Sequence, residues 1–254
     1  MPYSLKGRNV LVTGGSRQVL RLGALVCEKF AAEGSNVVVN YVNSKDSAEQ
    51  VAEKCKGLGA KVAVIQARGR QDVGVAGDCI RLVKESVEQL GGLDIIVNNA
   101  GWTRFSNFGD IYDLKHEEWD KCWQTNVMSQ LILMQEALPI FNSNPDGGVF
   151  LISSSIGGIT YKASSMAYAV TKAAGLHLMK CLASTQGPKV RVNAVLPGLL
   201  LTEWGMRYSE EKKQEYRDKA VLKEVTGLED TADIFISTAK NTSVTGQQLV
   251  VGMS

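Results

Sequence analysis

The sequence lacks a strong charge of either sign, and it lacks cysteine pairs. Its 28 lysines and arginines against 26 aspartates and glutamates give a formal net charge of +2, too little for the concentrated positive surface that binds nucleic acid. Five cysteines are an odd number, and no two stand at the Cys-x-x-Cys spacing of a metal or redox site. We therefore expect reduced intracellular thiols, no bound metal and no nucleic-acid partner.

Long apolar runs are missing too. The first ten residues lack the apolar stretch of a signal peptide, and no window approaches the ~18 unbroken apolar residues of a membrane span. What remains is a chain of 254 residues, 44% hydrophobic and 21% charged, which is the composition of an ordinary soluble globular protein. We expect a cytoplasmic protein with residues 1–254 in a single domain and no membrane partner.

Short β-branched runs alternate with helix-length amphipathic stretches. Runs such as Val37–Val39 and Ile95–Val97 are apolar without alternation, as expected for strands covered on both faces. This order predicts an α/β fold, a doubly wound Rossmann-type parallel sheet of seven strands with helices on both faces. The expected strands are 9–13, 36–41, 61–66, 93–98, 148–153, 190–196 and 248–251. The expected helices are 23–33, 45–58, 75–90, 117–141, 164–185 and 209–220, with Gly34, Gly59 and Gly91 as C-terminal caps.

Residues 199–228 resist this assignment. Trp204, Met206 and Tyr208 precede a charged run from Glu210 to Lys219, and such a run is usually the solvated face of a helix. The aromatic and methionine residues before it could instead form the underside of a lid over a ligand. We therefore take 199–228 as a candidate substrate lid.

Two polar turns follow expected strands at the same edge of the sheet. Thr13-Gly14-Gly15-Ser16-Arg17 ends the first strand, and its backbone N–H groups could hold a phosphate at the start of a helix. It could equally be a plain strand-to-helix connection. Asn98-Asn99-Ala100-Gly101 ends the fourth strand, either beside a ligand crevice or as a hydrogen-bonded turn that ties neighbouring strands together.

Tyr168 and Lys172 stand at i and i+4 of an expected helix, and therefore on one face of it. A phenol has a reference pKa near ~10, and a nearby ammonium group favours its phenolate, so the pair suits proton transfer. Isolated Tyr-x-x-x-Lys pairs are common by chance. Here Ser155 follows the end of the fifth strand shortly before the helix, so strand end and helix can converge on one cleft.

These segments together resemble the classical short-chain dehydrogenase/reductase family over nearly the whole chain. The resemblance implies hydride transfer between a nicotinamide and a carbonyl or alcohol carbon. It implies that Tyr168 exchanges a proton with the substrate oxygen, Ser155 polarises that oxygen, and Lys172 lowers the pKa of the phenol and holds the nicotinamide ribose. Asn126 would hold a water on the proton path. The implied cofactor-binding residues are Gly14, Ser16, Arg17, Asp72, Asn99, Ala100, Gly101, Tyr168, Lys172, Pro197, Gly198 and Thr202.

The chain departs from the family pattern at the adenine and pyrophosphate end. Gln18 and Leu20 stand where the family has glycines, as though residues 18–20 were inserted and Arg21 replaced a glycine. Glycine is usual there because the backbone must approach the pyrophosphate closely. A second change places Arg68 to Gln71 before Asp72. Three explanations stay open: insertions that still allow cofactor binding, insertions that impair it, or errors in the translated gene.

The segment after the second strand, Asn40 to Ser44, offers no carboxylate to bind a ribose 2′-OH, and Arg17, with Arg21, Arg68 or Arg70, could pair with a 2′-phosphate. We therefore expect NADP(H) and a ketoreductase for a small or mid-sized, largely apolar carbonyl substrate. The alternatives are an NAD-dependent alcohol dehydrogenase and a non-redox binding protein. The resemblance also implies a homodimer or homotetramer. Candidate pocket residues, for which ordinary packing is the alternative, are Trp102, Phe105, Trp204 and Met206.

Overall fold

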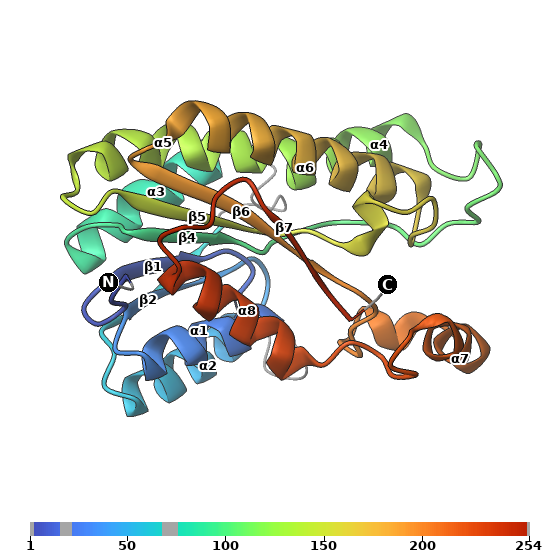
Figure 1. The fold of residues 1–254 in the computed structure, drawn as a ribbon, viewed down its shortest axis with the longest axis horizontal. Helices are drawn as coiled ribbons and strands as arrows, with labels where there is room; N and C mark the ends of the chain where they lie inside the picture. The colour runs from blue at the N-terminus through green and yellow to red at the C-terminus, as the bar shows by residue number, and fades with distance from the viewer. Residues whose placement is uncertain (1–2, 16–21, 68–75, 253–254) are drawn as a thin grey trace.

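The computed structural model describes residues 3–15, 22–67 and 76–252. Its centre is a parallel sheet of seven strands in the order β3-β2-β1-β4-β5-β6-β7 (Figure 1). Every neighbouring pair runs parallel, so the predicted doubly wound sheet is confirmed. The strands are β1 Asn9–Val12, β2 Asn36–Tyr41, β3 Val62–Gln66, β4 Ile95–Asn98, β5 Gly148–Ser153, β6 Val190–Pro197 and β7 Gln248–Val251.

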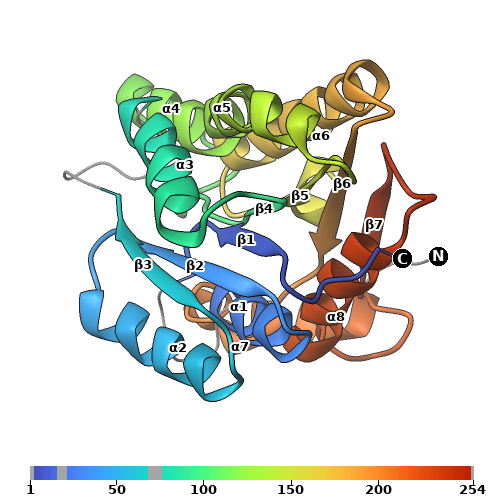
Figure 2. The ribbon, with the colours of Figure 1, turned by 90° about the vertical axis from the view of Figure 1, so that its left-hand side faces the viewer.

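Helices cover both faces of the sheet (Figure 2). One layer holds α1 Leu22–Ala32, α2 Lys45–Gly57 and α8 Leu228–Lys240. The other holds α3 Ala76–Leu90, α4 His116–Trp123, α5 Ser129–Ser143 and α6 Met166–Gln186. Helix α7, Glu210–Lys219, lies beyond the carboxyl end of the strands rather than on a face (Figure 1). Among the described residues, no helix combines the length and apolarity needed to cross a bilayer.

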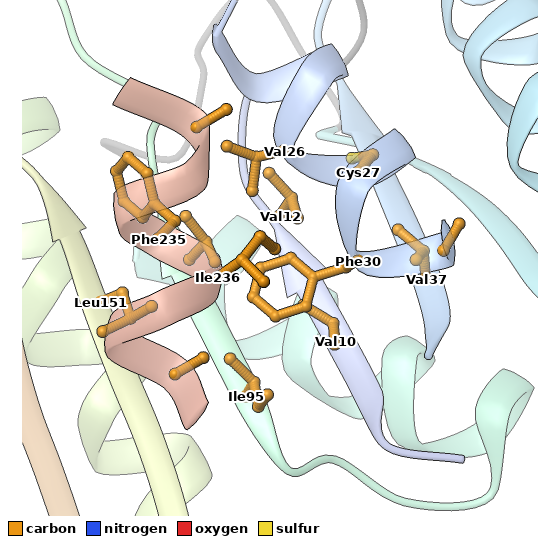
Figure 3. Close-up of a cluster of buried hydrophobic side chains, with 14 of the residues drawn as sticks. Val10, Val12, Val26, Cys27, Phe30, Val37, Ile95, Leu151, Phe235 and Ile236 are labelled. Atoms are coloured by element: carbon orange, nitrogen blue, oxygen red, sulfur yellow. The ribbon is translucent and has the colours of Figure 1, made fainter. Parts of the chain in front are cut away.

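Each face of the sheet has its own apolar core. In β1, Val10 and Val12 point into the core beneath α1 and α8, where Phe30 and Phe235 pack (Figure 3), whereas Leu11 points into the core on the other face. Successive strand residues face opposite sides. Burial on both sides therefore explains why the central strands are apolar at every position.

Two helix predictions need correction. The long helix expected over 117–141 is divided into α4, a π-helical segment at Gln124–Met128, and α5. Helix α8 was missed, although its buried Ala232, Phe235, Ile236 and Ala239 show the i, i+3, i+4, i+7 spacing of a helix that packs on a core. The predicted cap positions are confirmed, because Gly34, Gly59 and Gly91 all have positive φ.

The strand order places a crevice between β1 and β4. From β1 the chain passes to β2 and β3 on one side, whereas β4, β5, β6 and β7 continue on the other side. The loops that leave the carboxyl ends of β1 and β4 therefore diverge, and ligands of such sheets bind at this point. Both predicted polar turns, at Gly14 and at Asn99, leave from these two strands.

Candidate active site

A pocket of about 500 Å³ lies at the carboxyl edge of the sheet. It brings together ten of the predicted site residues: Gly14, Asn99, Ala100, Gly101, Ser155, Tyr168, Lys172, Pro197, Gly198 and Thr202. The other predicted catalytic residue, Asn126, is buried, and it is not part of the pocket lining that the structure describes. Ser16, Arg17 and Asp72 lie outside the described residues, as do Gln18, Leu20, Arg21 and 68–71.

Ser155 and Tyr168 meet across a short helical turn. Ser155 caps the 3-10 turn Ile156–Gly158 (η2), and its Oγ accepts a hydrogen bond from the Gly157 N–H at 3.0 Å. A Cβ added to Gly157 would lie 3.4 Å from Ser155 Oγ and 3.7 Å from Tyr168 Cε1, so glycine lets the two side chains share this space. Helix α6 begins just before Tyr168, where Ser165 Oγ accepts from the Tyr168 N–H.

Lys172 lies one turn further along α6 and is only 4% exposed. Its Nζ donates to the Ser153 carbonyl at 2.9 Å and lies 5.4 Å from the centre of the Tyr168 ring. Burial disfavours the charged ammonium and lowers the pKa of Lys172 to about 8. The amine therefore changes its charge close to neutral pH, in contact with the strand end that precedes Ser155.

The pKa of Tyr168 is raised, whereas we expected it to be lowered. Burial raises it above the usual value of a phenol, and this effect exceeds the opposing hydrogen bond with Ser155. We expected Lys172 to make the phenol more acidic, but both groups are buried, and the cost of removing a phenolate from water is the larger effect. At neutral pH the Tyr168 hydroxyl therefore keeps its proton and can donate it.

Asn126 lies in the π-helical segment Gln124–Met128, a local widening that often occurs at functional sites. Its Oδ1 accepts from the Trp102 N–H at 2.8 Å, and its Nδ2 lies 2.9 Å from the Trp102 carbonyl and 3.0 Å from Thr171 Oγ1. Its own carbonyl accepts a hydrogen bond from Gln130 Nε2 at 2.6 Å. In the described structure Asn126 thus ties the loop after β4 to α6.

Thr171 is a site residue that the sequence analysis missed. It is buried between Tyr168 and Lys172 on α6, and its Oγ1 contacts Asn126 Nδ2, Cys122 Sγ at 3.4 Å and the Tyr168 carbonyl at 3.0 Å. The signal was its place inside the Tyr-x-x-x-Lys pattern, on the side of α6 that faces α4. Thr171 connects α6, which carries Tyr168, to the π-helical segment of Asn126.

The turns after β1 and β4 are linked by hydrogen bonds. Thr13 Oγ1 accepts from the backbone N–H groups of Asn99 and Ala100 at 3.0 and 2.9 Å, and Thr13 Oγ1 donates to Asn98 Oδ1 at 3.2 Å. Asn99 Nδ2 donates to the Thr13 carbonyl at 3.0 Å. The interpretation of this segment as a hydrogen-bonded tie is therefore confirmed, and the tie also forms the wall of the pocket.

Two glycines let helix α1 approach this wall closely. Gly14 has a φ of +64°, in the left-handed region that glycine adopts at little cost. A Cβ on Gly23 would lie 2.6 Å from both the Gly14 carbonyl oxygen and Asn99 Nδ2, closer than side-chain packing permits. Gly23 thus allows the close helix-to-strand packing that one glycine of a dinucleotide-binding turn provides, although it stands three positions later than the family spacing.

The pocket has the features that a nicotinamide dinucleotide requires. It extends from Gly14, Gly23 and Asn43 to Lys172, along the crevice at which such sheets bind dinucleotides. Gly198 also lines the pocket, and a Cβ there would meet Thr226 Oγ1 at 2.4 Å. The residues present therefore fit the group: the backbone at Gly14 would face its phosphates, Lys172 its ribose, and the backbone at Gly198 its nicotinamide amide.

The remaining wall is aromatic. Trp102, Phe105 and Trp204 line the pocket as predicted, and the Trp204 ring packs edge-on at 5.7 Å against the ring of Tyr168. Met206 was a wrong candidate, because it is 53% exposed and is not part of the described pocket lining. Segment 199–228 supplies two further lining rings that we did not single out for the pocket, Tyr208 and Tyr216.

Known proteins resemble this chain over nearly its whole length. The family model described as enoyl-(acyl carrier protein) reductase matches residues 21–253. The 3-oxoacyl-(acyl-carrier-protein) reductase FabG of Staphylococcus aureus is 34% identical over 247 residues, which cover 96% of this chain and 96% of that protein. A solved short chain dehydrogenase from Burkholderia cenocepacia J2315 in complex with NADP is 27% identical, with a TM-score of 0.87 and 98% of each chain covered.

A second solved structure, 7α-hydroxysteroid dehydrogenase complexed with NADH and 7-oxo glycochenodeoxycholic acid, is also 27% identical, with a TM-score of 0.87 over 98% of this chain and 95% of that one. The model match and the Staphylococcus relative both extend over nearly the whole length that carries Ser155, Tyr168 and Lys172. On this basis the chain belongs to the classical short-chain dehydrogenase/reductase family of oxidoreductases.

Proposed function

We propose that the protein is an NADPH-dependent ketoreductase for a small or mid-sized carbonyl substrate with a largely apolar body. The observation that carries this proposal is the position of a protonated Tyr168, hydrogen-bonded to Ser155 and one turn from Lys172, in the wall of an aromatic pocket. A bound nicotinamide supplies the hydride. Tyr168 donates a proton to the carbonyl oxygen, and Ser155 holds that oxygen by a hydrogen bond.

The raised pKa of Tyr168 supports the reductive direction. Reduction of a carbonyl consumes a proton at oxygen, and a phenol that stays protonated at neutral pH provides it. Alcohol oxidation needs a base at this position instead. Burial of Tyr168 opposes formation of that base, so the NAD-dependent alcohol dehydrogenase is the weaker candidate.

The choice of NADPH rests on the rim of the pocket beyond β2. Val42 and Asn43 line it, and no aspartate or glutamate occurs in the pocket lining that the structure describes. A carboxylate there would repel the 2′-phosphate of NADPH. Arg17 in the first turn is our candidate partner for that phosphate. The solved relative in complex with NADP supports this choice, whereas the relative with NADH shows that the same fold also accepts the other cofactor.

Residues 199–228 are our proposed substrate lid. Tyr208 packs at 5.0 Å against Phe105 from the loop after β4, and at 5.9 Å against Tyr216 from α7. The Phe105 contact links the segment to the loop after β4, and the Tyr216 contact joins two parts of the segment itself. We propose that residues 199–228 close over the substrate and exclude water during the transfer.

A titration of NADPH and NADH against the intrinsic tryptophan fluorescence tests the cofactor proposal, because Trp102 and Trp204 line the pocket. We expect saturable binding of NADPH and a higher kcat/KM with NADPH than with NADH on a shared aldehyde or ketone. A higher kcat/KM with NADH would overturn the choice of NADPH. Absence of saturable binding at millimolar concentrations of both cofactors would instead favour the non-redox binding protein.

We further propose that the chain forms a homodimer or homotetramer. Trp123 at the end of α4 is 42% exposed and Val170 on α6 is 47% exposed, and large apolar side chains at a helical surface support an interface between subunits. Sedimentation velocity at micromolar concentration measures the mass. A monomer at all concentrations would contradict this proposal and leave the redox assignment intact.

A further inference from the structure

Cations pack against two aromatic rings of the pocket wall, Trp102 and Phe105, and we call this part of the wall the entrance. Lys121 Nζ on α4 lies 5.0 Å from the centre of the Trp102 ring, and Arg207 Cζ lies 4.5 Å from the centre of the Phe105 ring. Both rings line the pocket, as do Lys121 itself and Lys162 after η2. A cation over an aromatic face is held in place by the ring, so these charges are positioned at the entrance.

Lys121, Lys162 and Arg207 are the three cations of this region. In the part of the chain that the structure describes, none of them belongs to an ion pair, whereas Asp113 and Glu118 beside the entrance are both paired with Arg104 at 2.8 and 2.6 Å. Glu117, Asp120 and Glu203 belong to the same segments and, like Arg207, they are outside the described lining. Lys121, Lys162 and Lys172 are therefore the charged side chains of the described lining, and no carboxylate is among them.

The charges lie at the substrate end of the pocket, away from the expected phosphates of a dinucleotide. Lys121 belongs to α4, which lies above the carboxyl end of the sheet in Figure 1, and Arg207 belongs to the segment before α7, which lies below it. The turn at Gly14 and the rim at Asn43 form the other end. Phosphates of the cofactor therefore do not account for the cations at the entrance.

We propose that Lys121, Lys162 and Arg207 bind an anionic group of the substrate, so that the preferred substrate is a carbonyl compound with an apolar body and a carboxylate or phosphate at its outer end. This inference rests on the proposed ketoreductase function and deepens it. An ammonium that packs on a ring still has N–H groups that can donate to an anion, and a guanidinium still has the N–H groups along its edge. A cleft with charges of one sign between apolar walls also attracts oppositely charged ligands from solution.

A matched pair of substrates tests the proposal: 4-formylbenzoate and its uncharged methyl ester, each reduced at saturating NADPH. The measured quantity is the ratio of their kcat/KM values in the wild type, Lys121→Gln, Arg207→Gln and Lys84→Gln. Lys84 is an exposed lysine of α3 outside the pocket, so it controls for net charge. We expect each of the two pocket variants to lower the ratio of acid to ester about tenfold, and Lys84→Gln to leave it at the wild-type value.

The ionic strength provides a second readout, because salt screens exposed charges. We expect salt to lower kcat/KM for the acid and to leave that for the ester nearly constant. Phenyl phosphate and benzoate, used as competitive inhibitors, distinguish a phosphate from a carboxylate preference. An acid-to-ester ratio that neither pocket variant changes would overturn the proposal, while turnover of both aldehydes would leave the ketoreductase function standing.

If neither aldehyde is reduced, the proposed function fails on these substrates, and binding decides the inference separately. Titration of 4-formylbenzoate against tryptophan fluorescence reports on Trp102 and Trp204 without turnover. Tighter binding of the acid than of the ester, weakened about tenfold by Lys121→Gln, would support the anion site. Equal binding of acid and ester would overturn it.

Discussion

The two ends of the pocket depend on opposite properties of their residues. At the proposed catalytic end, Ser155, Tyr168 and Lys172 offer polar atoms that are held by neighbours, such as the Lys172 Nζ that donates to the Ser153 carbonyl at 2.9 Å. At the proposed phosphate end, Gly14 and Gly23 allow close backbone packing because they have no side chain. The first end is therefore sensitive to the removal of atoms, and the second to their addition. Substitutions at the two ends should fail in different ways.

The largest effect is expected from removing one oxygen at the catalytic end. Tyr168→Phe keeps the ring that packs against Trp204 and loses the proton donor, so we expect turnover to fall by about 10³-fold or more. The affinity for NADPH should stay within about threefold. Steady-state rates and a fluorescence titration of the variant measure the two quantities. Wild-type turnover on a good substrate would refute the role of Tyr168.

The next largest effect is expected when a rise in pH removes the charge of Lys172. Its pKa is lowered to about 8, so the ammonium is present below that pH and is lost above it. If the charge is needed, kcat/KM for reduction should be constant below pH 7 and fall about tenfold per unit above pH 8. Measurement of kcat/KM at saturating NADPH between pH 6 and 10 shows whether the activity falls in this way. Activity that stays level to pH 10 would show that the charge of Lys172 is not required.

Addition of one methyl group tests the other end. The Cβ of Gly23→Ala would lie 2.6 Å from the Gly14 carbonyl oxygen, so we expect a loss of about 1–3 kcal/mol in the free energy of unfolding and weaker binding of NADPH. Gly57→Ala is the matched control, because a Cβ there meets nothing within 4 Å at the end of α2. The control should be neutral or stabilising by up to about 1 kcal/mol. Urea denaturation compares both, and equal stabilities would exclude the close contact at Gly23.

The same contrast separates what the sequence predicted from what it did not. The strands, and the meeting of Ser155, Tyr168 and Lys172 in one pocket, followed from local signals: apolar runs, and polar residues just after strand ends. Burial effects did not, because they depend on the whole fold. The pKa of Tyr168 is set by its surroundings rather than by the lysine one turn away, and the π-helical segment at Asn126 breaks a pattern that reads as one continuous helix. Likewise, the need for glycine at position 23 is visible only in the fold, where an added Cβ would collide with Asn99 Nδ2.

Thr171 tests how far the catalytic end extends beyond the residues that face the pocket. Thr171→Val keeps the shape of the side chain and removes the hydroxyl that contacts Asn126 Nδ2 at 3.0 Å. Because Asn126 Nδ2 also has the Trp102 carbonyl as a partner at 2.9 Å, we expect a loss of only about 1 kcal/mol in stability, with a lower kcat. Thr171→Ser restores the hydroxyl and should restore kcat. Equal kcat in the valine and serine variants would exclude a positioning role.

The smallest effect is expected from shortening the loop at the phosphate end, where the sequence has three residues more than the family pattern. Deletion of Gln18–Leu20 together with Arg21→Gly yields Thr13-Gly14-Gly15-Ser16-Arg17-Gly-Leu22-Gly23, which restores the family spacing around the glycine that packs against Asn99. We expect NADPH to bind about three- to tenfold more tightly, because backbone can then approach the pyrophosphate. Arg21→Gly alone is the control for the lost charge. Unchanged or weaker binding of the shortened protein would show that the longer loop is not an impediment, and that this end of the pocket tolerates added atoms where Gly23 does not.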